Sequence, residues 1–131
     1  MKSKIIKQGT YKGLHWWITK NGREEDCPLL RWYCAYIETP KKNTNYFKDG
    51  NGDLIKGGNI VAIGYEINAE EDYRDLQVNG GVNYGITNNE RTVIGWDYAH
   101  CWNEGWDEDL EEIQEQVEQA IDTLIEKLRE E

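Results

Sequence analysis

The residues best suited to chemistry lie in two short segments in the second half of the chain. Gly80 and Gly81 form a pair that lets the backbone approach a ligand closely or adopt positive φ. Asp97 and His100 are three residues apart near the expected end of a strand, within reach of each other and of a ligand. Together with Asn79 they form a candidate small-ligand site, for a nucleotide sponge or a metal-dependent hydrolase. The same residues also fit a structural role, in which a buried Asp–His hydrogen bond fixes the connection from strand to helix.

The cysteines suggest a second kind of chemistry. Cys27, Cys34 and Cys101, with His100, are the residue types of a structural zinc site, but their spacing lacks a C-x₂₋₄-C pair. Cys34 also lies in an expected strand that alternates toward a core. An odd number of cysteines, with no signal-peptide pattern at the N-terminus, favours free thiols in a reducing compartment. The sequence therefore predicts three reduced, unligated thiols and no cofactor; only the alternative site would need one divalent metal ion.

Two further patterns fall short of a catalytic or metal site. Residues 49–53 resemble the start of an EF-hand loop, but Leu54 replaces the required Gly and Ile60 replaces the bidentate Glu. An ordinary Asn-Gly turn is the better interpretation. No glycine-rich segment precedes a helix to bind phosphate, and no nucleophile elbow is present. No pattern of residues therefore requires an enzymatic function.

The elements that would position these residues are mainly strands. Aromatic, β-branched and alternating apolar residues predict strands at residues 13–19, 29–39, 60–67, 78–86 and 91–98. The segment 78–86 is interrupted by glycines and fits a strand with a bulge. The remaining segments are expected to be a long loop at 41–59, a polar break with about one helical turn at 69–75, and a turn at 87–90.

Residues 107–130 predict a long amphipathic helix. Its apolar residues recur at helical spacing and form one stripe: Leu110, Ile113, Val117, Ala120, Ile121, Leu124 and Leu128. Asp107 is expected to cap its N-terminus. The stripe would pack on the sheet, so the sequence predicts an α+β fold, a small antiparallel sheet packed against a long acidic C-terminal helix. The length of 131 residues suits a single domain over 1–131.

The charge of the chain is unevenly distributed. Residues 107–131 contain 11 acids and 2 bases, whereas residues 1–48 contain 10 bases and 4 acids. The net charge of −10 argues against direct binding of nucleic acid, which needs clustered Lys and Arg, but permits a basic protein partner. The alternative is that the charge only maintains solubility. No apolar run approaches the ~20 residues of a membrane span, so a cytoplasmic protein is expected.

Several segments resemble a family of small, mostly uncharacterised proteins of bacteriophages and prophages. The shared pattern is a strand ending in Pro-Lys, then HGG-x-T-Y-S, then G-F-D-C-A-H and a C-terminal helix. The matching segments here are residues 32–41, 79–85 and 95–100, followed by the helix, and the resemblance covers most of residues 10–130. Asn79 replaces the family's His, so a metal site that used this His would lose one ligand.

The resemblance implies a phage-type inhibitor of host defence, because small acidic proteins of this origin include anti-CRISPR proteins that occlude a nuclease's DNA-binding channel. It implies a non-enzymatic protein in the cytoplasm of the bacterial host. The partner would be a nucleic-acid-handling protein with a basic channel, such as a CRISPR effector nuclease. Such a channel would attract a line of negative charge. The acids that recur every three or four residues on the outer side of the helix are the predicted partner-binding residues: Glu111, Glu115, Glu118, Asp122 and Glu126.

Overall fold

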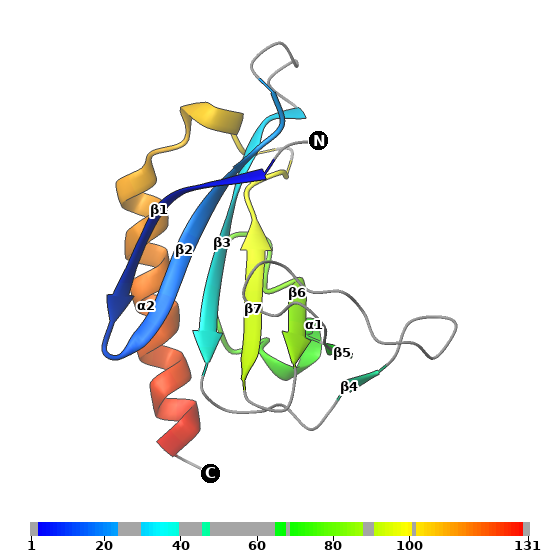
Figure 1. Cartoon of the computed structure of the whole chain (residues 1–131), viewed down its shortest axis with the longest axis vertical. Helices are drawn as coiled ribbons and strands as arrows, with labels where there is room; N and C mark the ends of the chain where they lie inside the picture. The colour runs from blue at the N-terminus through cyan, green and yellow to red at the C-terminus, as the bar shows by residue number, and fades with distance from the viewer. Residues whose placement is uncertain are drawn as a thin grey trace.

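The computed structural model describes the backbone of residues 3–23, 30–39, 46–47, 65–67, 69–87, 91–100 and 102–129. The strands in these stretches form one sheet with the order β1-β2-β3-β7-β6-β5-β4, and every neighbouring pair is antiparallel. A long helix, α2, runs along one face of this sheet (Figure 1). The predicted α+β arrangement, an antiparallel sheet with a long C-terminal helix, is confirmed.

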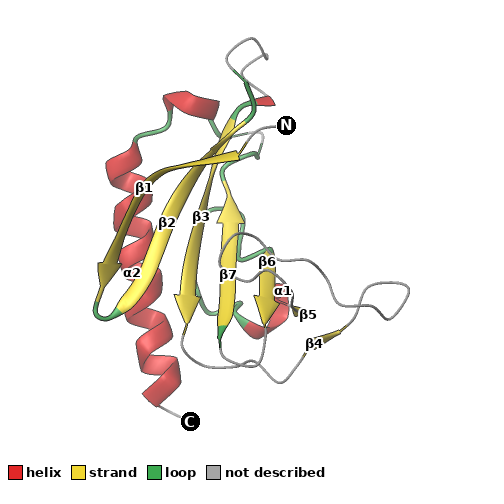
Figure 2. Cartoon of the chain, viewed as in Figure 1, coloured by secondary structure: helices red, strands yellow, loops and turns green. Residues whose placement is uncertain are grey.

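The bounds of the strands are β1 (Ser3–Tyr11), β2 (Leu14–Asn21), β3 (Trp32–Thr39), β4 (Tyr46–Phe47), β5 (Tyr65–Ile67), β6 (Tyr84–Thr87) and β7 (Thr92–Asp97). The helical elements are α1 (Ala69–Asp72), a 3₁₀ helix η2 (Gly105–Asp107) and α2 (Leu110–Arg129). Figure 2 shows the strands of the sheet beside the single long helix. None of the described helices combines the length and the apolar character needed to cross a membrane.

The predicted strands agree with the structure best in the centre of the sheet. The predictions at 13–19, 29–39 and 91–98 correspond to β2, β3 and β7 with shifted ends, and the helical turn expected within 69–75 is α1. Strand β1 was not predicted, because its lysines and polar residues flank a single Ile-Ile pair and show no alternation. Within the predicted loop 41–59, residues 46–47 form β4; the other residues of that loop, and 60–64 and 88–90, lie outside the described residues.

The prediction of a bulged strand over 78–86 is wrong for its first half. Strand β6 begins only at Tyr84. Gly80 and Gly81 have φ values of +72° and +81°, a left-handed conformation that an extended strand excludes. The segment before β6 is therefore a turn, closed by a hydrogen bond of 2.9 Å from the Gly81 N–H to the Val78 carbonyl.

The two faces of the sheet differ in what covers them. Tyr33, Ala35 and Ile37 of β3 are buried in the same core cluster as Val117 and Ile121 of α2. The residues that alternate with them on β3 point to the opposite face, which we call the helix-free face because no described helix packs on it. The apolar side of α2 thus decides which set of β3 residues forms the main core.

Cys34 lies on the helix-free face, together with Trp32 and Tyr36. All three side chains are half-buried. The prediction that Cys34 alternates toward the core is therefore wrong, because the core-facing set on β3 begins at Tyr33. The helix-free face has a smaller apolar cluster of its own around Trp17.

The apolar stripe of α2 is confirmed, but the helix itself does not begin at the predicted residue. Ile113, Val117 and Leu124 are at most 2% exposed. The helix begins at Leu110, three residues later than expected, because Asp107 ends the 3₁₀ helix. Asp109 takes the capping role predicted for Asp107: its Oδ1 accepts a hydrogen bond of 2.9 Å from the Glu111 N–H.

Candidate functional site

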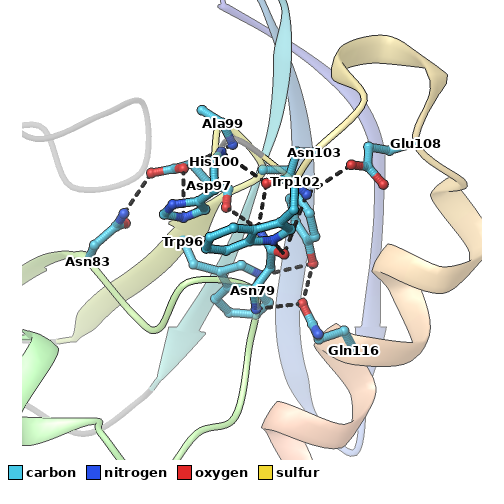
Figure 3. Close-up of polar contacts among 11 residues, drawn as sticks. Asn79, Asn83, Trp96, Asp97, Ala99, His100, Trp102, Asn103, Glu108 and Gln116 are labelled. Atoms are coloured by element: carbon cyan, nitrogen blue, oxygen red, sulfur yellow. Dashed lines mark hydrogen bonds and ion pairs between the residues drawn. The ribbon is translucent and has the colours of Figure 1, made fainter. Parts of the chain in front are cut away.

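Asn79, Asp97 and His100 come together where β7 ends and the chain turns toward α2 (Figure 3). His100 Nε2 lies 3.4 Å from Asp97 Oδ1, so the predicted proximity of these two side chains is confirmed. Asp97 Oδ1 also accepts a hydrogen bond of 3.1 Å from the Ala99 N–H, which fixes the turn after the strand. We call Asn79, Asp97, His100, Trp102 and Asn103 the junction cluster.

The side chain of Asn79 is the centre of the junction cluster. Its Nδ2 donates hydrogen bonds to the Asp97 carbonyl at 3.0 Å and to Asn103 Oδ1 at 2.9 Å. Its Oδ1 accepts from Trp102 Nε1 at 2.8 Å and from Asn103 Nδ2 at 3.4 Å. An amide has two donor hydrogens and two acceptor sites, so the protein itself uses the full capacity of this side chain.

The ring of His100 explains why residue 80 is a glycine. A Cβ atom at Gly80 would overlap the His100 ring, whereas a Cβ at Gly81 would meet open space. The ring of Trp102 also stacks on the His100 ring, at a centroid distance of 4.6 Å and an interplanar angle of 5°. The close backbone approach predicted for the glycine pair is thus an approach to His100. His100 Nε2 is buried; Asp97 Oδ1 lies 3.4 Å from it, at a geometry that is not a regular hydrogen bond, and the atom is closed off from solvent.

A second layer of hydrogen bonds joins the junction cluster to α2. Trp96 Nε1 donates to Tyr98 Oη at 2.9 Å, and Tyr98 donates to Gln116 Oε1 at 2.5 Å. The same Gln116 oxygen accepts from the backbone N–H of Asn79 at 3.0 Å. Burial raises the pKa of Tyr98, which keeps its hydroxyl protonated as a donor. These contacts favour the structural interpretation of the Asp97–His100 pair.

The described part of the chain gives little support to a metal site or a reactive thiol. It contains no group of three or more His, Cys, Asp or Glu that could hold a metal ion. Cys34 is a free thiol, and burial raises its pKa, which disfavours the reactive thiolate. Cys27, Cys101 and residues 49–53 lie outside the described residues, so predictions for them stay predictions.

The five acids predicted for partner binding form the acidic face of α2. Glu111, Glu115 and Glu126 are exposed, and Glu118 is partly exposed. Their spacing places them on the side of α2 opposite the buried stripe, so the expected separation of the two sides of the helix is confirmed.

Asp122 differs from the other four acids because it has a basic partner. Lys12, in the turn between β1 and β2, has its Nζ 2.6 Å from Asp122 Oδ1. The hydrogen bond from Lys12 lowers the pKa of Asp122, and the same bond raises the pKa of Lys12. Asp122 therefore does not contribute an unpaired charge to the predicted line of acids. No local pattern indicated this pair, because the two residues are 110 positions apart.

The acids upstream of Asp122 extend beyond the start of α2. From Glu104 to Glu126 the sequence contains ten acids and no Lys or Arg. Glu104, Asp107 and Asp109 are exposed. Glu108 is an exception, because its Oε1 accepts hydrogen bonds from Asn103 Nδ2 at 2.9 Å and from the Glu104 N–H at 2.8 Å. The exposed negative charge is thus concentrated around the N-terminal half of α2.

No family model, curated protein or solved structure matches this chain. The resemblance to a phage protein family accordingly stays a prediction.

Proposed function

We propose that this protein is a non-enzymatic, phage-type inhibitor of a host defence system that binds a nucleic-acid-handling protein through the acidic face of α2. The observation that supports it most is the placement of Glu111 and Glu115. Both are exposed, and neither has a basic partner among the described residues. When a basic partner covers such carboxylates, they can form charge-assisted hydrogen bonds with its Lys and Arg side chains. The isolated protein does not provide these bonds.

The proposed partner is a protein with a basic channel for nucleic acid, such as a CRISPR effector nuclease. A rigid helix that presents carboxylates every three or four residues offers negative charge about every 5–6 Å along its axis. This charge would compete with phosphates for the Lys and Arg side chains of the channel. Occupying the channel inhibits the nuclease without any chemical step, in the cytoplasm of the bacterial host.

The alternative function, a small-ligand or metal-dependent site at Asn79, Gly80, Gly81, Asp97 and His100, is supported only by the proximity of Asp97 and His100. The amide of Asn79 is saturated by protein groups, and the ring of His100 is packed against Gly80 and Trp102. A ligand would have to displace these contacts before it could reach Asn79 or His100.

The proposal is tested with a panel of purified, guide-loaded CRISPR effector nucleases. DNA binding and DNA cleavage are measured while the protein is titrated against a fixed concentration of each effector. For a susceptible effector we expect stoichiometric loss of DNA binding, weakening as salt rises because the Debye length falls from ~10 Å at 0.1 M to ~3 Å at 1 M. A complex with an effector that still binds its DNA target normally would contradict occlusion of the channel.

A further inference from the structure

The helix-free face contains a cavity that the proposed function does not use. Its volume is about 260 Å³, below the roughly 300–1,000 Å³ of sites for drug-sized ligands. Seven described residues line it: Trp32, Cys34, Tyr36, Asn83, Tyr84, Trp96 and Asp97. The side chain of Trp96 is buried in the main core, so the lining offers three aromatic rings and three polar side chains to a ligand. A cavity of this size and lining suits a small molecule.

The register of the sheet assembles the cavity. Tyr36 of β3 lies opposite Gly95 of β7, and Gly95 lies opposite Tyr84 of β6. A Cβ atom at Gly95 would be 2.6 Å from Tyr36 Cδ1, so the absence of a side chain there makes room for the Tyr36 ring. Cys34 lies opposite Asp97, which places a thiol and a carboxylate next to the rings.

Two of the rings form a corner. The rings of Tyr36 and Tyr84 are 5.4 Å apart between centroids and nearly perpendicular, at 84°. Trp17 stacks on Tyr36 at 5.5 Å and 19°, which supports that ring from the neighbouring strand. Trp32, on the same face of β3, provides a third aromatic side chain. Aromatic rings set at an angle to one another are the walls of the cages that bind cationic groups.

Asp97 provides the charge of the cavity. Among the described lining residues it is the only Asp or Glu, and none of them is Lys or Arg. Its Oδ2 accepts a hydrogen bond of 2.6 Å from Asn83 Nδ2, and its Oδ1 accepts from the Ala99 N–H at 3.1 Å. Burial raises the pKa of both Cys34 and Tyr36, so these two groups stay uncharged at neutral pH.

We propose that this cavity binds a small organic cation whose charge is carried by a methylated ammonium group. Aromatic rings attract cations. Three such rings line the cavity, and the carboxylate of Asp97 adds a negative charge. Asn83 Nδ2 faces one oxygen of this carboxylate, and the Ala99 N–H and His100 Nε2 face the other. Three of its roughly four acceptor sites are thus directed to protein groups, so the cavity favours a cation that needs charge but donates no hydrogen bonds. A quaternary ammonium group has this property, whereas guanidinium and primary ammonium groups need acceptors for their N–H groups.

The test is a titration of the isotope-labelled protein, followed by NMR, with choline and with its uncharged isostere 3,3-dimethylbutan-1-ol. Ionic strength is held constant, and the pH is 8, at which a histidine is ordinarily neutral. We expect choline to bind saturably with a dissociation constant of about 1 mM or tighter, with the largest shifts at Trp32, Tyr84 and Asp97. The isostere should bind at least about tenfold more weakly, because it has the same shape and no charge.

Variants separate the cavity from the general negative charge of the protein. Trp32→Leu and Asp97→Asn should each weaken choline binding about tenfold or more, through loss of a ring and of the charge. Tyr84→Phe keeps the ring and should bind choline like the wild type. Glu115→Gln removes a carboxylate from the acidic face of α2 and should also bind like the wild type.

Three results of the titration would overturn the proposal. These are equal binding of choline and its isostere, shifts confined to α2, and the absence of saturation at about 10 mM choline. Because Asp97 also belongs to the junction cluster, Tyr84→Leu serves as a second ring-deletion variant if Asp97→Asn does not fold. Normal choline binding by folded Trp32→Leu and Tyr84→Leu proteins would exclude the aromatic cavity as the site.

Discussion

The junction cluster and the acidic face of α2 are both polar, but they differ in where their partners lie. In the junction cluster the partners are inside the protein, and Asn79 alone takes part in four side-chain hydrogen bonds. On the acidic face, Glu111 and Glu115 have no basic partner in the described part of the chain. Polar groups with internal partners stabilise the fold, whereas exposed groups without them remain free to bind another molecule.

Residue types alone would rank the junction cluster above the acidic face as a candidate functional site. The location of their partners reverses that ranking. An Asp–His pair next to two glycines is a typical candidate for chemistry, and a run of Glu on a helix is typical of a solvated surface. The contacts assign the Asp–His pair to the connection between β7 and α2. Glu111 and Glu115 carry charge that no basic residue balances in the described part of the chain.

The acidic face can bind a partner only if α2 has one buried side and one outward side. Two substitutions at neighbouring positions test this. Val117 is fully buried, so Val117→Asp should lower the free energy of unfolding by about 4 kcal/mol or more, because the new charge has no partner. Glu118→Lys, on the outward side, should change it by less than about 0.5 kcal/mol. Chemical denaturation of both variants provides the measurement. Similar losses for the two would show that the sides of the helix are wrongly assigned.

The structural role of the junction cluster is tested at its glycine pair. Gly80→Ala should cost about 2–3 kcal/mol of stability, since it combines a positive φ with overlap of the His100 ring. Gly81→Ala has a similar φ but meets open space, so it should cost only about 1 kcal/mol.

A double variant isolates the contact with His100. Replacing His100 by Ala in the Gly80→Ala protein should recover part of the loss, because the overlap disappears while the backbone strain stays. Thermal or chemical denaturation is measured for the wild type, Gly80→Ala, His100→Ala and the double variant. Equal stability of Gly80→Ala and Gly81→Ala would show that His100 does not dictate the glycine at position 80.

The smallest expected effect concerns Lys12, the one basic partner found on the acidic face within the described residues. Its hydrogen bond lowers the pKa of Asp122, so Lys12→Met should raise that pKa toward the ordinary value of 3.8. The ion pair stabilises the fold above the ordinary pKa of Asp122 and loses this effect as the pH falls through the lowered value. Both side chains are exposed, so the change in melting temperature should be slight.

An NMR pH titration of the Asp122 carboxyl group in both proteins measures this shift. Lys12→Arg, which keeps the positive charge, is the matched control and should leave the pKa low. An Asp122 pKa that is the same with and without the Lys12 side chain would mean that this acid is as free as Glu111 and Glu115.

The parts of the fold predicted from sequence are those governed by local periodicity. The apolar stripe of α2 recurs at helical spacing, and the alternation of β3 has period two, so both elements follow from neighbouring residues. The face of β3 that would be covered was not predictable in this way. It depends on where α2 packs, and for this reason Cys34 was placed toward the wrong side.

The contacts of the candidate site depend on pairs of residues far apart in the sequence. The pairs Lys12–Asp122 and Asn79–Asn103 are separated by 110 and 24 positions. Neither pair leaves a periodic signal. The proximity of Asp97 and His100 was predictable because they are three residues apart near a strand end. The packing of His100 against Gly80 was not predictable. It depends on a turn that replaces the first half of the predicted strand.

The most direct test of the central proposal uses two charge-matched double variants. Glu111→Lys with Glu115→Lys changes the acidic face, and Glu70→Lys with Glu71→Lys changes α1. Each Glu→Lys substitution raises the net charge by two, so both double variants shift it from −10 to −6. Inhibition of DNA binding by a susceptible effector nuclease is then measured at 0.1 M salt, after circular dichroism has confirmed that both variants are folded.

We expect the acidic-face variant to lose inhibition by at least about tenfold and the α1 variant to inhibit like the wild type. We also expect an Asp97→Ala and His100→Ala double variant to inhibit normally wherever it is folded. A folded acidic-face variant that inhibits as strongly as the wild type would contradict the proposed role of α2.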